Sequence, residues 1–175
     1  MDQRIERVKS FVRDIAGFPK PGIVFKDWMP LLADPVVFAE AVSLIARPFR
    51  DDRIDQVLGM EARGFLIGLP IAMQLGAGFV PVRKQGKLPY DTYGVTYDLE
   101  YGSDTLEMHV DAVLEGQRIL IVDDLLATGG TAAATVELVG KARGEVVGCA
   151  FLIELDFLAG RPRLGVERVH SLIHY

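Results

Sequence analysis

The sequence predicts an α/β fold built on a largely parallel sheet. Aliphatic segments of strand length alternate along the chain with segments of helix length, which is the order found in βαβ units. The four aliphatic residues at 119–122 show no polar alternation, as is typical of a strand covered on both faces. With 175 residues, half of them hydrophobic, the whole chain is expected to form a single domain.

The N-terminal part predicts two helices separated by a turn. Hydrophobic residues recur at helical spacing at Ile5, Val8, Val12 and Ile15. We therefore expect an amphipathic helix over about 5–15, which the prolines and glycines of 17–22 bring to an end. A short β-prone run follows at 23–25. Asp34 before Pro35 is typical of an N-cap with proline at the first helical position, which predicts a helix to about Ala46.

The rest of the chain predicts alternating strands and helices. Strands are expected at 56–60, 79–82, 95–101, 105–110, 119–122, 145–153 and 169–173, and helices at 64–75 and 131–142. Residues 84–95 lack periodicity, so we expect a long loop there. Residues 101–104 are expected to turn between two antiparallel strands, which would form a flap on the sheet.

Composition excludes several classes of protein. The net charge of −5 argues against a nucleic-acid binder, although a local basic patch can still attract a small polyanion. Cys149 is the only cysteine and lies in an apolar run, so we expect it to be buried and structural. The N-terminus has no apolar signal core, and the longest apolar stretch, 64–73, is too short to span a membrane. We therefore expect a cytoplasmic protein that binds neither nucleic acid nor membrane.

The most specific motif lies at 119–131, where a buried strand leads through polar residues into a helix. The polar residues are Asp123, Asp124, Ala127, Thr128, Gly129, Gly130 and Thr131. Glycines let the backbone approach a ligand closely, and N–H groups at a helix start attract anions. Carboxylates accept hydrogen bonds from sugar hydroxyls, so this pattern suits a ribose 5-phosphate. For the acidic pair alone, a solvated turn is the alternative. Neither a Walker A motif nor a G-x-G-x-x-G motif is present.

Two further groups of charges suit a pyrophosphate. Arg83, Lys84 and Lys87 lie together where a strand enters the long loop. Glu61, Ala62 and Arg63 follow another strand, at the edge where α/β sheets bind ligands, and arginine can bind phosphate bidentately. A solvated charge run and a surface cation are the alternatives.

Glu100, at the end of a flap strand, is a candidate general base. The three histidines lack metal-ligand spacing, so no metal held by side chains is expected.

Taken together, these segments resemble the type I phosphoribosyltransferase family, and within it the branch that uses adenine. The resemblance covers nearly the whole chain and rests on residues 18–27, 61–65, 83–89, 99–102 and 123–131. The first and fourth of these segments distinguish the adenine branch from its relatives. The resemblance implies a five-stranded parallel core, an N-terminal hood over about 1–34, a flexible catalytic loop over about 84–110, and a homodimer.

The resemblance also implies a reaction and a set of roles. The 5-phosphoribosyl group of phosphoribosyl pyrophosphate (PRPP) would pass to N9 of adenine, giving AMP and pyrophosphate in purine salvage. Mg²⁺ would be bound mainly through PRPP, pyrophosphate and water. The resemblance implies that adenine contacts backbone groups of Val24 and Lys26 and stacks on Phe25. It implies that the ribose contacts Asp123 and Asp124, and that the 5-phosphate contacts residues 127–131. The implied pyrophosphate contacts are Glu61, Ala62, Arg63, Arg83, Lys84 and Lys87, and the implied catalytic residues are Glu100 and Arg63. Family members often have aspartate–serine in place of Glu61-Ala62, and arginine in place of Lys26.

Overall fold

The computed structural model describes residues 2–98 and 102–175. The chain divides into two compact units, Met1–Leu44 and Ile45–Tyr175, and each is described by itself. The single domain expected from the sequence stays a prediction.

The first unit is built around a small antiparallel hairpin. Its elements are α1 (Gln3–Lys9), β1 (Arg13–Ala16), β2 (Val24–Asp27), α2 (Met29–Ala33) and most of α3 (Pro35–Ala46). The prediction of one helix through Ile15 is wrong, because α1 ends at Lys9 and β1 pairs with β2. Arg13 and Asp27 join the two strands through an ion pair of 2.6 Å. The predicted N-cap of α3 is confirmed, since the Asp34 carboxylate accepts hydrogen bonds from the N–H groups of Val36 and Val37.

The second unit contains a mixed sheet whose centre is parallel. Its strands are β3 (Gln56–Met60), β4 (Gly78–Lys84), β5 (Thr92–Asp98), β6 (Ser103–His109), β7 (Arg118–Leu126), β8 (Glu145–Glu154) and β9 (Val169–His174). Within the described residues their order is β5-β6-β4-β3-β7-β8-β9. Five of these strands, β4, β3, β7, β8 and β9, are mutually parallel. Strands β6 and β5 add an antiparallel flap beside β4. The predicted α/β class, the five-stranded parallel core and the flap are confirmed.

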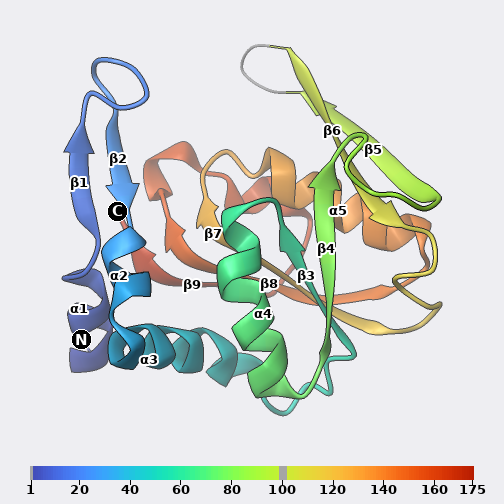
Figure 1. The fold of residues 1–175 in the computed structure, drawn as a ribbon, viewed down its shortest axis with the longest axis horizontal. Helices are drawn as coiled ribbons and strands as arrows, with labels where there is room; N and C mark the ends of the chain where they lie inside the picture. The colour runs from blue at the N-terminus through green and yellow to red at the C-terminus, as the bar shows by residue number, and fades with distance from the viewer. Residues whose placement is uncertain (1, 99–101) are drawn as a thin grey trace. The chain divides into compact units, whose positions relative to one another are not determined.

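Two helices cover the sheet of the second unit. Figure 1 shows α4 (Arg63–Leu75) in front of the sheet and α5 (Gly130–Lys141) behind it. The described residues of this unit also form three short 3₁₀ helices: η1 (Arg47–Phe49), η2 (Asp156–Leu158) and η3 (Arg161–Leu164). The strand at 119–122 is fully buried, as its aliphatic run predicts. Cys149 is also buried, and burial raises the pKa of its thiol to about 12, which supports the structural role predicted for it.

Three predicted boundaries are wrong where neighbouring strands extend the pairing. Strand β7 continues to Leu126 because β8 pairs with it as far as Glu154, so both aspartates lie inside the strand. Strand β5 begins at Thr92, which shortens the predicted loop to residues 85–91. Ser103 and Asp104 belong to β6 and not to a turn. No helix in the described part of the chain is long and apolar enough to cross a membrane.

Candidate active site

Two neighbouring cavities lie at the carboxyl ends of the parallel strands. The larger, of about 280 Å³, is lined by Glu61, Ala62, Arg63, Lys84, Tyr97, Asp104, Leu106, Asp123, Asp124 and Thr131. The smaller, of about 70 Å³, is lined by Asp123, residues 125–132 and Phe151. Asp123 and Thr131 line both cavities, so the two cavities adjoin at these residues.

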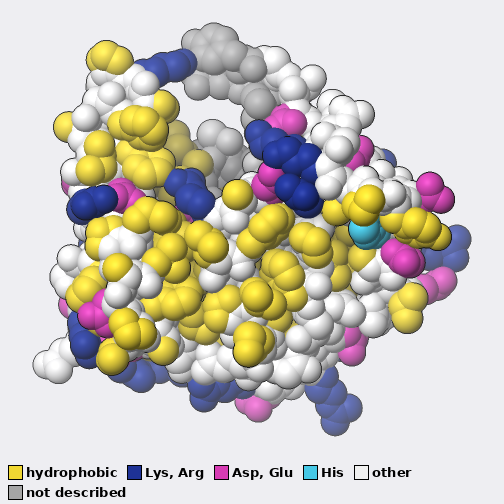
Figure 2. Space-filling view, viewed as in Figure 1, with side chains coloured by type: hydrophobic (Ala, Val, Ile, Leu, Met, Phe, Trp, Pro, Cys, Tyr) yellow, Lys and Arg dark blue, Asp and Glu magenta, His cyan; other side chains and the backbone are white. Residues whose placement is uncertain are grey.

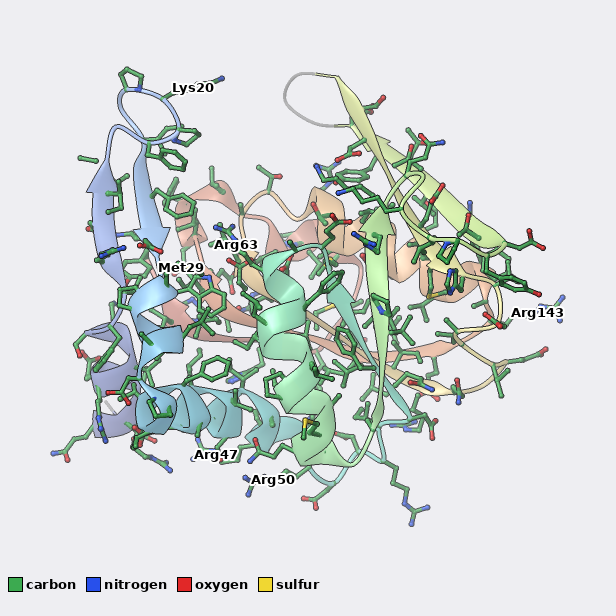
Figure 3. All side chains as sticks on the ribbon, in the orientation of Figure 1. Lys20, Met29, Arg47, Arg50, Arg63 and Arg143 are labelled. Atoms are coloured by element: carbon green, nitrogen blue, oxygen red, sulfur yellow. The ribbon has the colours of Figure 1, made fainter. Side chains whose placement is uncertain are left out.

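The acidic pair is held by strand β7 and by the start of α4. Asp124 is 4% exposed, and its carboxylate forms an ion pair of 2.8 Å with Nε of Arg63. Arg63 is the first residue of α4, as predicted from its position after β3 (Figure 3). Asp123 accepts a hydrogen bond from the backbone N–H of Asp124. Burial and the charge of Asp124 raise the pKa of Asp123 well above its usual value.

The glycine loop that follows β7 places the start of a helix beside the smaller cavity. Gly129 has φ of +80° and forms the N-cap of α5, and no side chain in the described part of the chain caps that helix. The first N–H groups of a helix have no partner within the helix, so they can bind an anion. A side chain on Gly129 would meet the Gly160 carbonyl oxygen at 2.4 Å, and one on Gly160 would meet that of Ala127 at 2.1 Å. The segment around Gly160 therefore packs directly against the glycine loop.

The predicted pyrophosphate cations are paired with carboxylates. Lys84 forms an ion pair of 3.0 Å with Asp104. Arg83 and Lys87 both pair with Glu61, which also accepts a hydrogen bond from the backbone N–H of Lys84. Burial alone would raise the pKa of Glu61, but the hydrogen bonds from Lys87, Lys84 and Arg83 outweigh burial and lower it to about 2. Glu61 is therefore a partly buried anion that anchors the first residues of the loop at 85–91.

The predicted adenine contacts lie on β2, in the N-terminal unit. Gly17 N–H donates to the Ile23 carbonyl, so the next pair, Ala16 and Val24, is a non-hydrogen-bonded pair of the ladder. By the same alternation the N–H and C=O groups of Val24 and Lys26 point away from β1. The Lys26 side chain forms an ion pair of 2.7 Å with Asp14. Phe25 meets Phe18 edge to face, with ring centroids 5.3 Å apart.

The structure brings together most of the predicted ribose, phosphate and pyrophosphate residues. Among them Arg83 and Lys87 do not line either cavity and reach the site only through Glu61. Glu100 lies outside the described residues. Sequence reasoning missed Tyr97, Asp104 and Gly160. Asp104 could have been found as a partner for the basic residues at 83–87, and Gly160 as a glycine shortly after the apolar strand predicted at 145–153.

One cluster of candidate metal ligands was not anticipated. Glu154, Asp156 and His174 place their ligand atoms within 4.8 Å of one another, apart from both cavities. Glu154 is already engaged by Arg161 and Ser171.

The parallel core, the acidic pair and the glycine loop together define a phosphoribosyltransferase. In agreement with this class, the model of the phosphoribosyl transferase domain family matches residues 27–170. An adenine phosphoribosyltransferase from Myxococcus xanthus is 57% identical over 94% of this chain and 89% of its own length. The chain belongs to the adenine phosphoribosyltransferase family.

Solved structures agree with this assignment. The crystal structure of adenine phosphoribosyltransferase from Rhodothermus marinus has a TM-score of 0.95 and 50% identity, with complete coverage of both chains. The enzyme from Saccharomyces cerevisiae, solved in complex with an imino-altritol bisphosphate and adenine, has a TM-score of 0.93 and 39% identity over 98% of this chain and 99% of its own.

Proposed function

We propose that this protein transfers the 5-phosphoribosyl group of PRPP to N9 of adenine, forming AMP and pyrophosphate in purine salvage. The observation that carries the proposal is the larger cavity, where an acidic pair, two cations and Thr131 at the end of the glycine loop meet. Such a cavity offers separate groups to a sugar, a pyrophosphate and a phosphate. The similarity to adenine phosphoribosyltransferases supports adenine as the base.

Asp123 and Asp124 hold the ribose in this proposal. Their carboxylates accept hydrogen bonds from the ribose hydroxyls. As the bond to pyrophosphate breaks, positive charge develops on the ribose ring, and nearby carboxylates stabilise that charge. The N–H groups of residues 127–131 bind the 5-phosphate at the start of α5.

The cations at the cavity bind the leaving pyrophosphate. Arg63 and Lys84 line the cavity, whereas Arg83 and Lys87 are held beside it by Glu61. A pyrophosphate carries more charge than a single carboxylate, so it can draw Lys84 from Asp104 and Lys87 from Glu61. Closure of the loop at 85–91 over the ligand would then exclude water from the reaction.

In this proposal, adenine binds along the edge of β2 that faces away from β1. The C=O and N–H groups of Val24 and Lys26 point away from β1 and can accept from the adenine amino group and donate to a ring nitrogen. Phe25 stacks on the base. Because the Lys26 side chain is held by Asp14, lysine in place of the common arginine should change this contact little. Glu100 acts as the general base that takes the purine ring proton.

The cavity suits a magnesium ion carried by the substrate. The carboxylates of Asp123 and Asp124 line the cavity, and oxygen atoms are the ligands that Mg²⁺ prefers. In this proposal Mg²⁺ would be bound mainly by pyrophosphate oxygens and water. Its chemistry would be to neutralise charge on the leaving group. Asp123 and Asp124 could orient its water molecules.

A homodimer is also part of the proposal. Leu66, Leu69 and Met73 are 45%, 48% and 76% exposed, and their spacing places them on one face of α4. Figure 2 shows hydrophobic side chains gathered over this helix. An exposed apolar face of this kind is typical of an interaction surface, and a second copy of the chain is the partner that the family resemblance implies. The cytoplasmic location and the lack of nucleic-acid binding stay predictions.

One assay tests the reaction. AMP formation from PRPP and Mg²⁺ is followed spectrophotometrically with adenine, hypoxanthine or guanine as the acceptor. We expect adenine to be strongly preferred, because a 6-oxopurine reverses the donor and acceptor pattern and leaves polar groups unpaired at about 1–3 kcal/mol each. Comparable kcat/KM for adenine and hypoxanthine would contradict the proposal, and absence of transfer to all three bases would indicate a PRPP-binding regulator.

A further inference from the structure

The arginines of η3 differ in what they contact. Arg161 is fully engaged: its guanidinium donates twice to Glu154 and once to the Val169 carbonyl. Arg163, two residues later, is exposed, and within the described residues its side chain makes no hydrogen bond or ion pair. Arg161 therefore fastens the segment to β8 and β9, whereas Arg163 remains available to a ligand.

Arg163 lies beside the glycine loop. Nη1 and Cζ of its guanidinium are 3.5 and 3.6 Å from the position that a Cβ atom on Gly130 would occupy, and Gly130 is the first residue of α5. Its neighbour Leu164 contacts the same loop, 3.0 Å from the corresponding position on Gly129. The close packing of Gly160 on Ala127 and Gly129 fixes the distance between this segment and the loop.

The charges around this point are unbalanced without a ligand. The N-terminus of α5 carries partial positive charge, and the first turn of the helix contains no acidic residue. The nearby Asp124 is already neutralised by Arg63. A guanidinium beside a positive helix end is unfavourable unless an anion lies between them, and a phosphate dianion can accept hydrogen bonds from both.

We propose that Arg163 is an additional binding residue for the 5-phosphate of PRPP and AMP. This proposal rests on the proposed function, in which the glycine loop binds that phosphate. The backbone N–H groups of the loop supply the neutral donors, and Arg163 supplies the side-chain positive charge that the loop itself lacks.

The experiment compares Arg163→Gln, Arg163→Lys and the wild-type protein in steady-state kinetics. Arg143→Gln is the matched control, because it removes the same charge from an exposed pair with Glu115. Loss of a charged hydrogen bond should raise KM for PRPP about tenfold in Arg163→Gln, with kcat and KM for adenine changed less than about twofold. Arg163→Lys should recover part of the affinity, because lysine keeps the charge but not the planar fork.

Inhibition constants locate the contact. Ribose 5-phosphate, a competitor that carries the 5-phosphate alone, should lose affinity for Arg163→Gln by about the same factor as PRPP, while pyrophosphate should inhibit as in the wild type. An unchanged KM for PRPP in Arg163→Gln would overturn the proposal. So would weaker pyrophosphate inhibition with normal ribose 5-phosphate inhibition, or a parallel rise in KM for both substrates with a lower Tm. Failure of the wild type to form AMP would instead refute the proposed function.

Discussion

At the scale of single residues, the predicted pyrophosphate cations of the site are each paired with a carboxylate. Asp124 pairs with Arg63, Asp104 with Lys84, and Glu61 with both Arg83 and Lys87. Each substitution in the site therefore releases a partner as well as removing a group. Predictions for these residues have to take account of both effects.

Replacing Asp123 and Asp124 together by asparagine should weaken the use of PRPP. Asparagine keeps the size of the side chain but removes the charge that strengthens hydrogen bonds to the ribose hydroxyls. We expect kcat/KM for PRPP to fall at least about tenfold, since hydrogen bonds to charged groups contribute about 1.5–3 kcal/mol. The far-UV circular dichroism should stay unchanged. Wild-type kcat/KM in a folded double variant would show that the acidic pair does not bind the ribose.

Glu61 should make the stability of the protein depend on acid pH. Its pKa in the folded protein is about 2, below the ordinary value of 4.5, so its ionised form stabilises the fold above pH 4.5. That contribution is lost as pH falls from about 4.5 towards 2. The difference in unfolding free energy between wild type and Glu61→Gln should therefore shrink across this range. Denaturant titrations at pH 7, 4 and 3 measure it, and a difference that is constant with pH would contradict the prediction.

Glu100→Gln should lower kcat more than it raises KM for adenine. The amide can still hydrogen-bond the purine, but it cannot take the ring proton as N9 bonds to the ribose. General-base catalysis contributes about 10²–10⁴-fold, so kcat should fall by a factor in that range. Steady-state kinetics at saturating PRPP measure the change, and pre-steady-state bursts show whether product release limits the rate. A fall in kcat of only about twofold, without a burst, would show that another group takes the ring proton.

At the scale of elements, the loop between β4 and β5 is expected to respond to substrate. Residues 85–91 have no regular structure. Past the hydrogen bond from Gln85 N–H to the Thr105 carbonyl, Gly86 N–H donates to Glu107, and Lys87 contacts Glu61 through its ammonium and Arg83 through its carbonyl, all at exposed positions or at the edge of the loop. We expect the amides of residues 86–91 to exchange rapidly in the free protein and slowly with PRPP and Mg²⁺. Protection should begin at Tyr93 in both states. Val110 N–H donates to the Asp91 carbonyl, so Thr92 and His109 form a non-hydrogen-bonded pair, and Tyr93 with Met108 is the next hydrogen-bonded pair. Slow exchange at 86–91 in the free protein would refute this.

Local sequence patterns correctly predicted the elements whose structure depends on residues that are close together in the sequence. The aliphatic run of β7 and the Asp34–Pro35 start of α3 are examples. The patterns failed where a distant partner decides the structure. Arg13 to Ala16 continue a helical spacing, yet they form a strand because residues 24–27 pair with them.

The same distinction applies to the site. The glycine loop is contiguous in sequence and was predicted. Tyr97, whose hydroxyl lies 3.4 Å from that of Thr131, comes from the flap and was not.

At the scale of the whole molecule, the apolar face of α4 should control the oligomeric state. Changing Leu69 and Met73 together to glutamate places two like charges on the face that we propose joins two copies, which should convert a dimer into a monomer. Light scattering coupled to size-exclusion chromatography measures the mass. Leu114→Glu is the control, since Leu114 is 63% exposed but does not belong to α4. A double variant that remains dimeric would exclude this face.

The burial of Cys149 makes the chain convenient for labelling. Its thiol is inaccessible and, with a pKa of about 12, almost entirely protonated at neutral pH. Since it is the only cysteine in the sequence, a thiol introduced at Gln85 would be the single position open to a maleimide dye. Fluorescence from that position could follow the movement of the loop during turnover, one molecule at a time, without first removing a native cysteine.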